Sequence, residues 1–225
     1  MIHLVWSQLA IAFSALLPLI NPLGSALVFY GLVGAAPPEV YRRLARRIAM
    51  NTVLFLLVIE LIGAALLAFF GISLPIVEVA GGLVLASMGW SLLNQQGADA
   101  HQQEKADQAQ ASNIEELNRQ TFYPLTFPIT AGPGCIVIML TLTAHATTHK
   151  LVPDLFAHLG ILIAVIVLCV LIYFAYAYAP LVTQKISPET ARGIVRVIAF
   201  LLLCIGVQIA WNGIRSLLLT VLQHH

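Results

Sequence analysis

Long apolar runs, separated by short polar stretches, make up most of this chain. A helix needs about 20 mostly apolar residues to cross the hydrocarbon core of a bilayer. Six runs reach that length, and they cover residues 4–33, 49–70, 72–93, 122–144, 159–179 and 195–219. The pattern therefore predicts an all-α integral membrane protein with six transmembrane helices.

A single polar segment divides the six runs into two sets of three. Residues 95–120 are rich in Gln, Asp and Glu and show no sustained apolar period, so we expect a polar cytoplasmic linker there. The predicted units are a first three-span repeat at residues 1–94, the linker at 95–120 and a second three-span repeat at 121–225. Because three is odd, the second half must enter the membrane from the opposite side, which is typical of an inverted repeat.

The positions of Lys and Arg predict the orientation, because cytoplasmic loops retain positive charge. Of the 11 basic residues, only Lys150 and Arg215 lie on one side of the predicted topology. The others lie on the opposite side: Arg42, Arg43, Arg46, Arg47, Lys105, Arg119, Lys185, Arg192 and Arg196. Both termini are therefore expected on the periplasmic side.

Composition supports lipid as the surroundings of most of this surface. The chain is 60% hydrophobic and 9% charged, whereas a soluble domain carries about 25% charged residues. A net charge of +1 gives no basic face, so no nucleic-acid partner is expected. The three cysteines lie inside apolar runs without metal-ligand spacing, and we expect them to pack as small apolar side chains. No cofactor, metal site or catalytic constellation is predicted, so we do not expect an enzyme.

The first and fourth runs are interrupted near their middles by proline and glycine, at residues 17–25 and 122–134. Proline inside a helix costs about 3 kcal/mol or more, so a break followed by a new helix is predicted. Asn21 is a preferred N-cap before Pro22, and Thr130 or Gly132 before Pro133 repeats the arrangement. The alternative is a proline kink whose lost hydrogen bonds are repaired by neighbouring helices.

Each restarted helix leaves unpaired N–H groups and the positive end of a helix dipole at membrane depth. Two such ends approaching from opposite sides predict a binding site for a small solute that carries a carboxylate or other acceptors. The predicted substrate-binding residues are Asn21, Pro22, Gly24, Ser25, Thr126, Thr130, Gly132, Pro133 and Gly134. Their amide and hydroxyl side chains would bond the solute, and the N–H groups near Gly24 and Gly134 would hold a carboxylate.

Two acidic residues lie within the predicted spans. Glu60 is deep in the second run, where an ionisable group is costly, which makes it a candidate for proton coupling. The alternatives are that Glu60 is simply protonated or reaches a water-filled vestibule. Glu78 lies near the outer start of the third span, and there we expect solvation at the interface.

Other polar residues have structural explanations. Gln208 and Asn212 lie one turn apart on the sixth span and are expected to bond to another helix or to line a path. Tyr173, Tyr176 and Tyr178 close the fifth span and fit an aromatic belt at the membrane surface.

Three segments together resemble the MarC family of bacterial inner-membrane proteins. They are Asn21-Pro22-Leu23-Gly24, the stretch F-Y-P-L-T-F-P-I-T-A-G-P-G at residues 122–134, and Ala80-Gly81-Gly82. The resemblance covers nearly the whole chain, and Cys135 is its one local departure, at a position where a small aliphatic residue is more usual. It implies six spans, a location in the bacterial inner membrane and, from some members, transport of small neutral amino acids such as glycine or alanine.

These observations together predict a secondary transporter or exporter of a small neutral solute, in which one half rocks against the other. A channel-like facilitator of small solutes and a non-transporting membrane assembly protein are the alternatives. Membrane lipids are expected partners. The substrate, the direction of transport, the coupling ion and the formation of a homo-oligomer stay open at this point.

Overall fold

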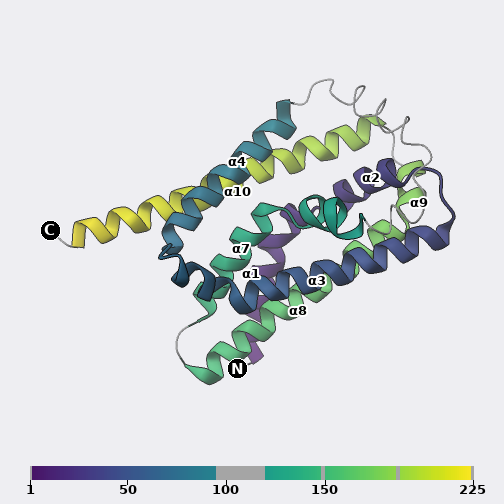
Figure 1. The fold of residues 1–225 in the computed structure, drawn as a ribbon. Coiled ribbons are helices and arrows are strands. Elements are labelled where there is room, and N and C mark those ends of the chain that lie inside the picture. The colour runs from purple at the N-terminus through teal and green to yellow at the C-terminus, as the bar shows by residue number, and fades with distance from the viewer. Residues whose placement is uncertain (1, 95–119, 148–149, 186–187, 224–225) are drawn as a thin grey trace.

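The computed structural model describes residues 2–94, 120–147, 150–185 and 188–223, and these residues are almost entirely helical. The predicted all-α class is confirmed. The elements in chain order (Figure 1) are α1 (Ile2–Ile20), α2 (Pro22–Val33), α3 (Pro38–Phe69), α4 (Leu74–Asn94), η1 (Thr121–Thr130), α7 (Pro133–Ala146), α8 (Leu151–Ala177), α9 (Ala179–Lys185) and α10 (Pro188–Gln223).

Five segments are each long and apolar enough to cross a membrane: Ile2–Val33, Pro38–Phe69, Leu74–Asn94, Leu151–Ala177 and Gly193–Leu222. A sixth forms if η1 and α7 are taken together, and these two helices are bent by 67°. Each predicted run overlaps one of these segments, although the second and fifth runs begin 11 and 8 residues after the segments that they match. The predicted linker lies outside the described residues except for Gln120, and the repeat arrangement remains a prediction.

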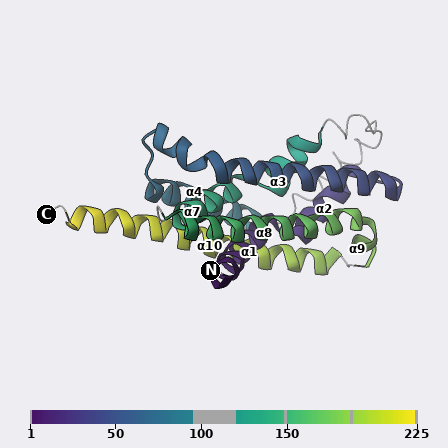
Figure 2. The ribbon, with the colours of Figure 1, turned by 90° about the horizontal axis from the view of Figure 1, so that it is seen from below.

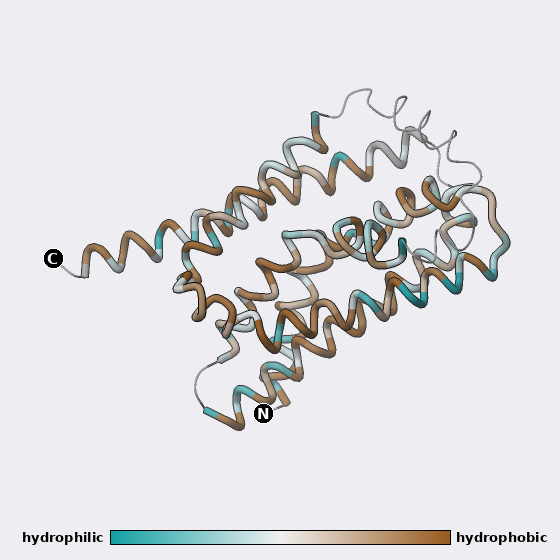
Figure 3. Tube along the Cα trace, in the orientation of Figure 1, coloured by the Kyte–Doolittle hydropathy of each residue, from teal (hydrophilic) through white to brown (hydrophobic). Residues whose placement is uncertain are grey.

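Helix α3 begins at Pro38, eleven residues before the apolar run that predicted it. Its first three turns carry four arginines on one side, while Tyr41, Leu44 and Ile48 are buried on the other. This amphipathic start extends the helix beyond the apolar run because one face still packs against the protein. Figure 3 shows this end of α3 as more hydrophilic than the rest of the helix.

Helices α4 and α10 pack against each other as an antiparallel pair set to one side of the remaining helices (Figure 1), and the C-terminal end of α10 extends beyond the other helices (Figure 2). Glycines spaced by seven residues line this contact: Gly82 and Gly89 on α4, Gly206 and Gly213 on α10. A Cβ added at Gly206 would lie 2.7 Å from the Gly82 oxygen, and one at Gly89 would lie 2.8 Å from the Ala199 oxygen. Glycine thus allows the two backbones to touch, as is common between membrane helices.

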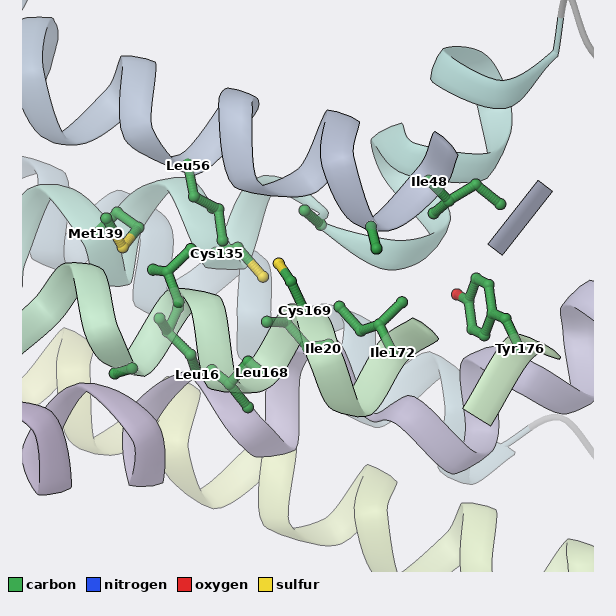
Figure 4. Packing of buried hydrophobic residues seen from close by; sticks show 14 of the residues in the cluster. Leu16, Ile20, Ile48, Leu56, Cys135, Met139, Leu168, Cys169, Ile172 and Tyr176 are labelled. Carbon is green, nitrogen blue, oxygen red and sulfur yellow. The ribbon is translucent and has the colours of Figure 1, made fainter. Parts of the chain in front are cut away.

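The buried core lies on the other side, between α1, α3, α7 and α8. Figure 4 shows Leu16 of α1, Leu56 of α3 and Leu168 of α8 directed into it. Cys135 and Cys169 are free, buried and directed toward each other there, as expected for cysteines that pack as apolar side chains. Cys204, by contrast, is exposed on α10.

Candidate functional site

The first interruption is a single residue, Asn21, between α1 and α2. Its backbone is left-handed, with φ 43° and ψ 67°, a conformation that asparagine tolerates better than most residues. Its side-chain oxygen accepts a hydrogen bond from the Gly24 N–H at 3.1 Å, and Pro22 is the first helical residue. The predicted restart is confirmed. In this conformation the Gly24 N–H, which was expected to face the solute, is occupied by the cap.

The second interruption is longer and sharper. Within η1, Tyr123 and Phe127 have extended backbones, and the bonds before Pro124 and Pro128 are cis. Gly132 is the N-cap of α7 and has an extended backbone. Because glycine has no side chain, the first turn of α7 has no side-chain cap. The predicted restart at Pro133 is therefore confirmed. Pro133 has no N–H and the Cys135 N–H donates to the Gly132 oxygen, so the Gly134 N–H is the group that an anion could take at this end.

The N-terminus of α7 is covered by side chains from two other helices. Gly134 is buried, and a Cβ added there would lie 2.6 Å from Cδ2 of Leu19 on α1 and would also clash with Leu85 on α4. Glycine at this position therefore lets both leucines approach the start of α7. The amide end is enclosed by apolar groups, where its partial charge is poorly screened.

Three hydroxyl groups repair the two interruptions in the same way, by bonding to a carbonyl five residues earlier. Ser25 donates to the Ile20 oxygen at 2.8 Å, Thr126 to the Thr121 oxygen at 2.7 Å and Thr130 to the Leu125 oxygen at 2.6 Å. All three residues are buried. These bonds place side-chain donors on carbonyls beside the breaks, where no water could take that place.

The structure brings the two interruptions together around one tyrosine. The Ser25 hydroxyl of α2 lies 3.5 Å from the Ile129 oxygen of η1, and the Thr130 hydroxyl lies 2.8 Å from that of Tyr176 on α8. Tyr176 also interacts with Ser25. We call Ser25, Thr130 and Tyr176 the hydroxyl cluster. It joins the first half of the chain to the second deep inside the protein.

The assignment of Tyr176 to an aromatic belt is wrong. Its side chain is 0% exposed and stacks on Phe29 with ring centroids 4.6 Å apart. Phe29 in turn meets Tyr41 edge-on at 5.7 Å. Tyr178 is 41% exposed, and its place in an aromatic belt at the membrane surface stays a prediction. Sequence reasoning missed Tyr176 because its apolar neighbours along α8 give no sign of which face is buried.

The row of aromatic rings ends at a surface cavity of about 400 Å³. Tyr41 belongs to both, because its ring meets Phe29 while its hydroxyl donates to the Gly34 oxygen at 2.6 Å. The residues that line the cavity are Tyr30, Gly34, Ala35, Ala36, Pro37, Tyr41 and Pro180. The cavity therefore lies where α2 ends, beside the charged start of α3.

Glu60 has a partner that the sequence did not suggest. The residue is 7% exposed, and its carboxylate lies 3.3 Å from Nδ1 of His158 on α8. Nε2 of His158 lies 3.4 Å from the Thr147 hydroxyl. The helical rise of about 1.5 Å per residue separates Glu60 from Tyr41 by about 28 Å along α3. The Glu60–His158 pair therefore lies far from the aromatic row.

The sequence also made predictions for Glu78, Gln208 and Asn212, and the structure contradicts the one for Glu78. Solvation of Glu78 at the interface is wrong, because the side chain is 6% exposed, is covered by Gly213 of α10 and interacts with His145. Gln208 and Asn212 bond to each other, at 3.0 Å, and both are exposed. Among the residues that the structure describes, no group of three His, Cys, Asp or Glu side chains could hold a metal.

Comparison with known proteins finds one family over almost the whole chain. The family model described as "MarC family integral membrane protein" matches residues 6–218. The "UPF0056 inner membrane protein MarC" of Salmonella typhimurium is 26% identical over 216 residues, which cover 96% of this chain and 98% of the relative. The "UPF0056 membrane protein MJ1677" of Methanocaldococcus jannaschii is 29% identical over 93% of this chain and 97% of the relative. No solved structure matches the chain.

Proposed function

Since the chain belongs to the MarC family of integral membrane proteins, we propose that it is a secondary transporter or exporter of a small neutral solute in the inner membrane. Relatives named as inner membrane proteins support that location. The observation that carries the proposal is the meeting of two interrupted spans at the hydroxyl cluster. A small neutral amino acid such as glycine or alanine is the solute that fits best.

The chemistry of the interruptions suits a zwitterion. The carboxylate would take the N–H of Gly134 at the start of α7, where the helix dipole favours an anion, because Pro133 has no N–H and the Cys135 N–H donates to the Gly132 oxygen. The ammonium would take backbone carbonyls such as those of Ile20 and Ile129, which the Ser25 hydroxyl now contacts. In this proposal the hydroxyls hold the carbonyls when no solute is bound, and a small solute displaces them. The close packing around Gly134 favours a side chain no larger than a methyl group.

A closed contact beside the cluster supports alternating access. The aromatic row through Phe29 and Tyr41 separates the cluster from the cavity at the end of α2. Glu60, which is paired with His158 farther along α3, is the group that we propose to carry a coupling proton. Opening the aromatic row would expose the cluster to the compartment that the cavity faces.

Helix neighbours support the proposed inverted repeat. Helix α3 packs against η1 and α7, while α8 packs against α1 and α2. In an inverted repeat the second broken span corresponds to the first, α8 corresponds to α3 and α10 corresponds to α4. The contacts of α3 with the second broken span then correspond to those of α8 with the first. In Figure 1 the start of α3, α9 and the start of α10 lie toward the same end of the protein. That arrangement supports a cytoplasmic location for this end and periplasmic termini.

Uptake of labelled glycine and alanine into proteoliposomes tests the proposal. Wild-type protein should give saturable flux that rises when unlabelled solute is present on the opposite side. Thr130→Val keeps the side-chain shape, removes the hydroxyl and should lower uptake at least tenfold. Tyr178→Phe, at an exposed position of α8, is the matched control and should leave uptake unchanged.

Each other outcome identifies a different function. Flux that neither saturates nor responds to solute on the opposite side would favour the channel-like alternative. No flux above empty liposomes for any small amino acid would remove the transport proposal and leave an assembly role. Size-exclusion profiles of both variants in detergent establish that a loss of uptake is not a loss of fold.

A further inference from the structure

Helix α10 carries two opposite faces, and only one of them is covered by this chain. The covered face holds Ala199, Gly206, Ala210 and Gly213 against α4. On the opposite face, side chains at alternating spacings of four and three residues are exposed. These residues, which we call the outer seam, are Val197, Leu201, Cys204, Gln208, Trp211 and Arg215.

Spacings of four and three residues keep side chains on one line along a helix and are typical of helices that pair along their length. Exposed apolar side chains in this line need only lipid. Gln208 is different, because it lies at the middle of the span Gly193–Leu222, where the bilayer offers no water. Its position therefore calls for a polar partner.

The partner inside the chain satisfies only part of the amide. Nε2 of Gln208 donates to Oδ1 of Asn212 at 3.0 Å. The Gln208 oxygen and the Asn212 NH₂ group have no hydrogen bond with any other residue in the described part of the chain. Leaving such groups in hydrocarbon costs several kcal/mol, so an outside donor and acceptor at this depth would be strongly favoured.

We propose that a second copy of this chain covers the outer seam and forms a parallel two-fold dimer through α10. An amide carries both donors and an acceptor, so Gln208 of each copy can bond to Gln208 of the other. A two-fold axis along the membrane normal keeps both copies in the same orientation and makes equal positions face each other. One polar residue within an apolar seam also fixes the register of the two helices.

The charged end of the seam is consistent with this geometry. Arg215 lies seven residues after Gln208, or about 10 Å toward the membrane surface at the helical rise of 1.5 Å per residue. Its long side chain can reach the headgroups, which keeps the two like charges apart. The paired region of the seam therefore runs from Val197 to Trp211.

Native Cys204 provides the test, because it lies on the seam one turn before Gln208, whereas Cys135 and Cys169 are buried. Facing positions of a parallel pair fall within the Cα separation of about 4.4–6.8 Å that a disulfide requires. Mild oxidation of native membranes should give a reducible band at twice the 24.4 kDa of one chain. Cys204→Ser should abolish that band.

Two further variants keep the test decisive. Leu83 of α4 is 59% exposed, so a cysteine there reports random collision of lipid-facing thiols. The variant Cys204→Ser combined with Leu83→Cys should crosslink at least tenfold less than the wild-type protein. Gln208→Leu should lower the dimer fraction in detergent at least tenfold, whereas Gln208→Asn should retain it. Equal crosslinking at both cysteine positions, or an unchanged dimer fraction in Gln208→Leu, would overturn the proposal. None of these readouts depends on transport.

Discussion

Replacing Gly206 by alanine should loosen the contact between α4 and α10. The added Cβ would lie 2.7 Å from the Gly82 oxygen and 2.9 Å from the Ala86 Cα, and it would clash with the Ala86 nitrogen. Ordinary contacts of a Cβ begin at 3.4 Å, so the two backbones must separate by more than the 3.4 − 2.7 = 0.7 Å that the Gly82 oxygen requires, because the Ala86 nitrogen is closer still. Backbone atoms cannot rotate away as a side chain can, so the whole contact has to open.

The expected cost follows from that displacement. A gap of about 0.5–1 Å forfeits a quarter to a half of each contact energy, and overpacking costs about 1–3 kcal/mol. Alanine also gains about 0.5–1 kcal/mol over glycine within a helix. Gly193→Ala on the same helix shares this gain, but its Cβ would meet nothing within 4 Å. We therefore expect Gly206→Ala to be about 2 kcal/mol less stable than Gly193→Ala.

Unfolding of the detergent-solubilised protein by added SDS measures this difference. Tryptophan fluorescence is a suitable signal because α4 carries Trp90 and α10 carries Trp211. The midpoint for Gly206→Ala should fall while the slope of the transition stays unchanged. Equal midpoints for the two variants would refute the reasoning, because the backbone contact would then contribute nothing measurable.

Two other substitutions probe the buried polar contacts by the same unfolding assay. Tyr176→Phe removes the hydroxyl that meets Thr130 and should cost about 1 kcal/mol, whereas Tyr178→Phe should cost nothing measurable; equal effects would contradict the hydroxyl cluster. His158→Ala leaves Glu60 without its partner and should cost about 2 kcal/mol, below the roughly 3–5 kcal/mol of a fully buried pair because His158 is partly exposed. Adding Glu60→Gln should recover part of that loss, and a purely additive double variant would show that the two residues do not interact.

The sequence by itself determined the spans and the two interruptions, although not where helices such as α3 begin. These features are local, because run length decides whether a helix can cross a bilayer and proline removes a backbone donor wherever it stands. The Asn21 cap and the restart at Pro133 followed from residue type alone. The sequence also placed the hydroxyl residues Ser25, Thr126 and Thr130 next to the two interruptions.

Only the tertiary structure decided which faces are buried and which residues meet. Ser25 and Ile129 are 104 residues apart, and Glu60 and His158 are 98 apart. No local pattern joins such residues. Soluble helices show their buried face by alternating with polar residues, but here both the core-facing and the lipid-facing side chains are apolar. That is why Tyr176 could be mistaken for a surface residue and why the cover of Glu78 by α10 was missed: packing, rather than hydrophobicity, selects the interior of a membrane protein.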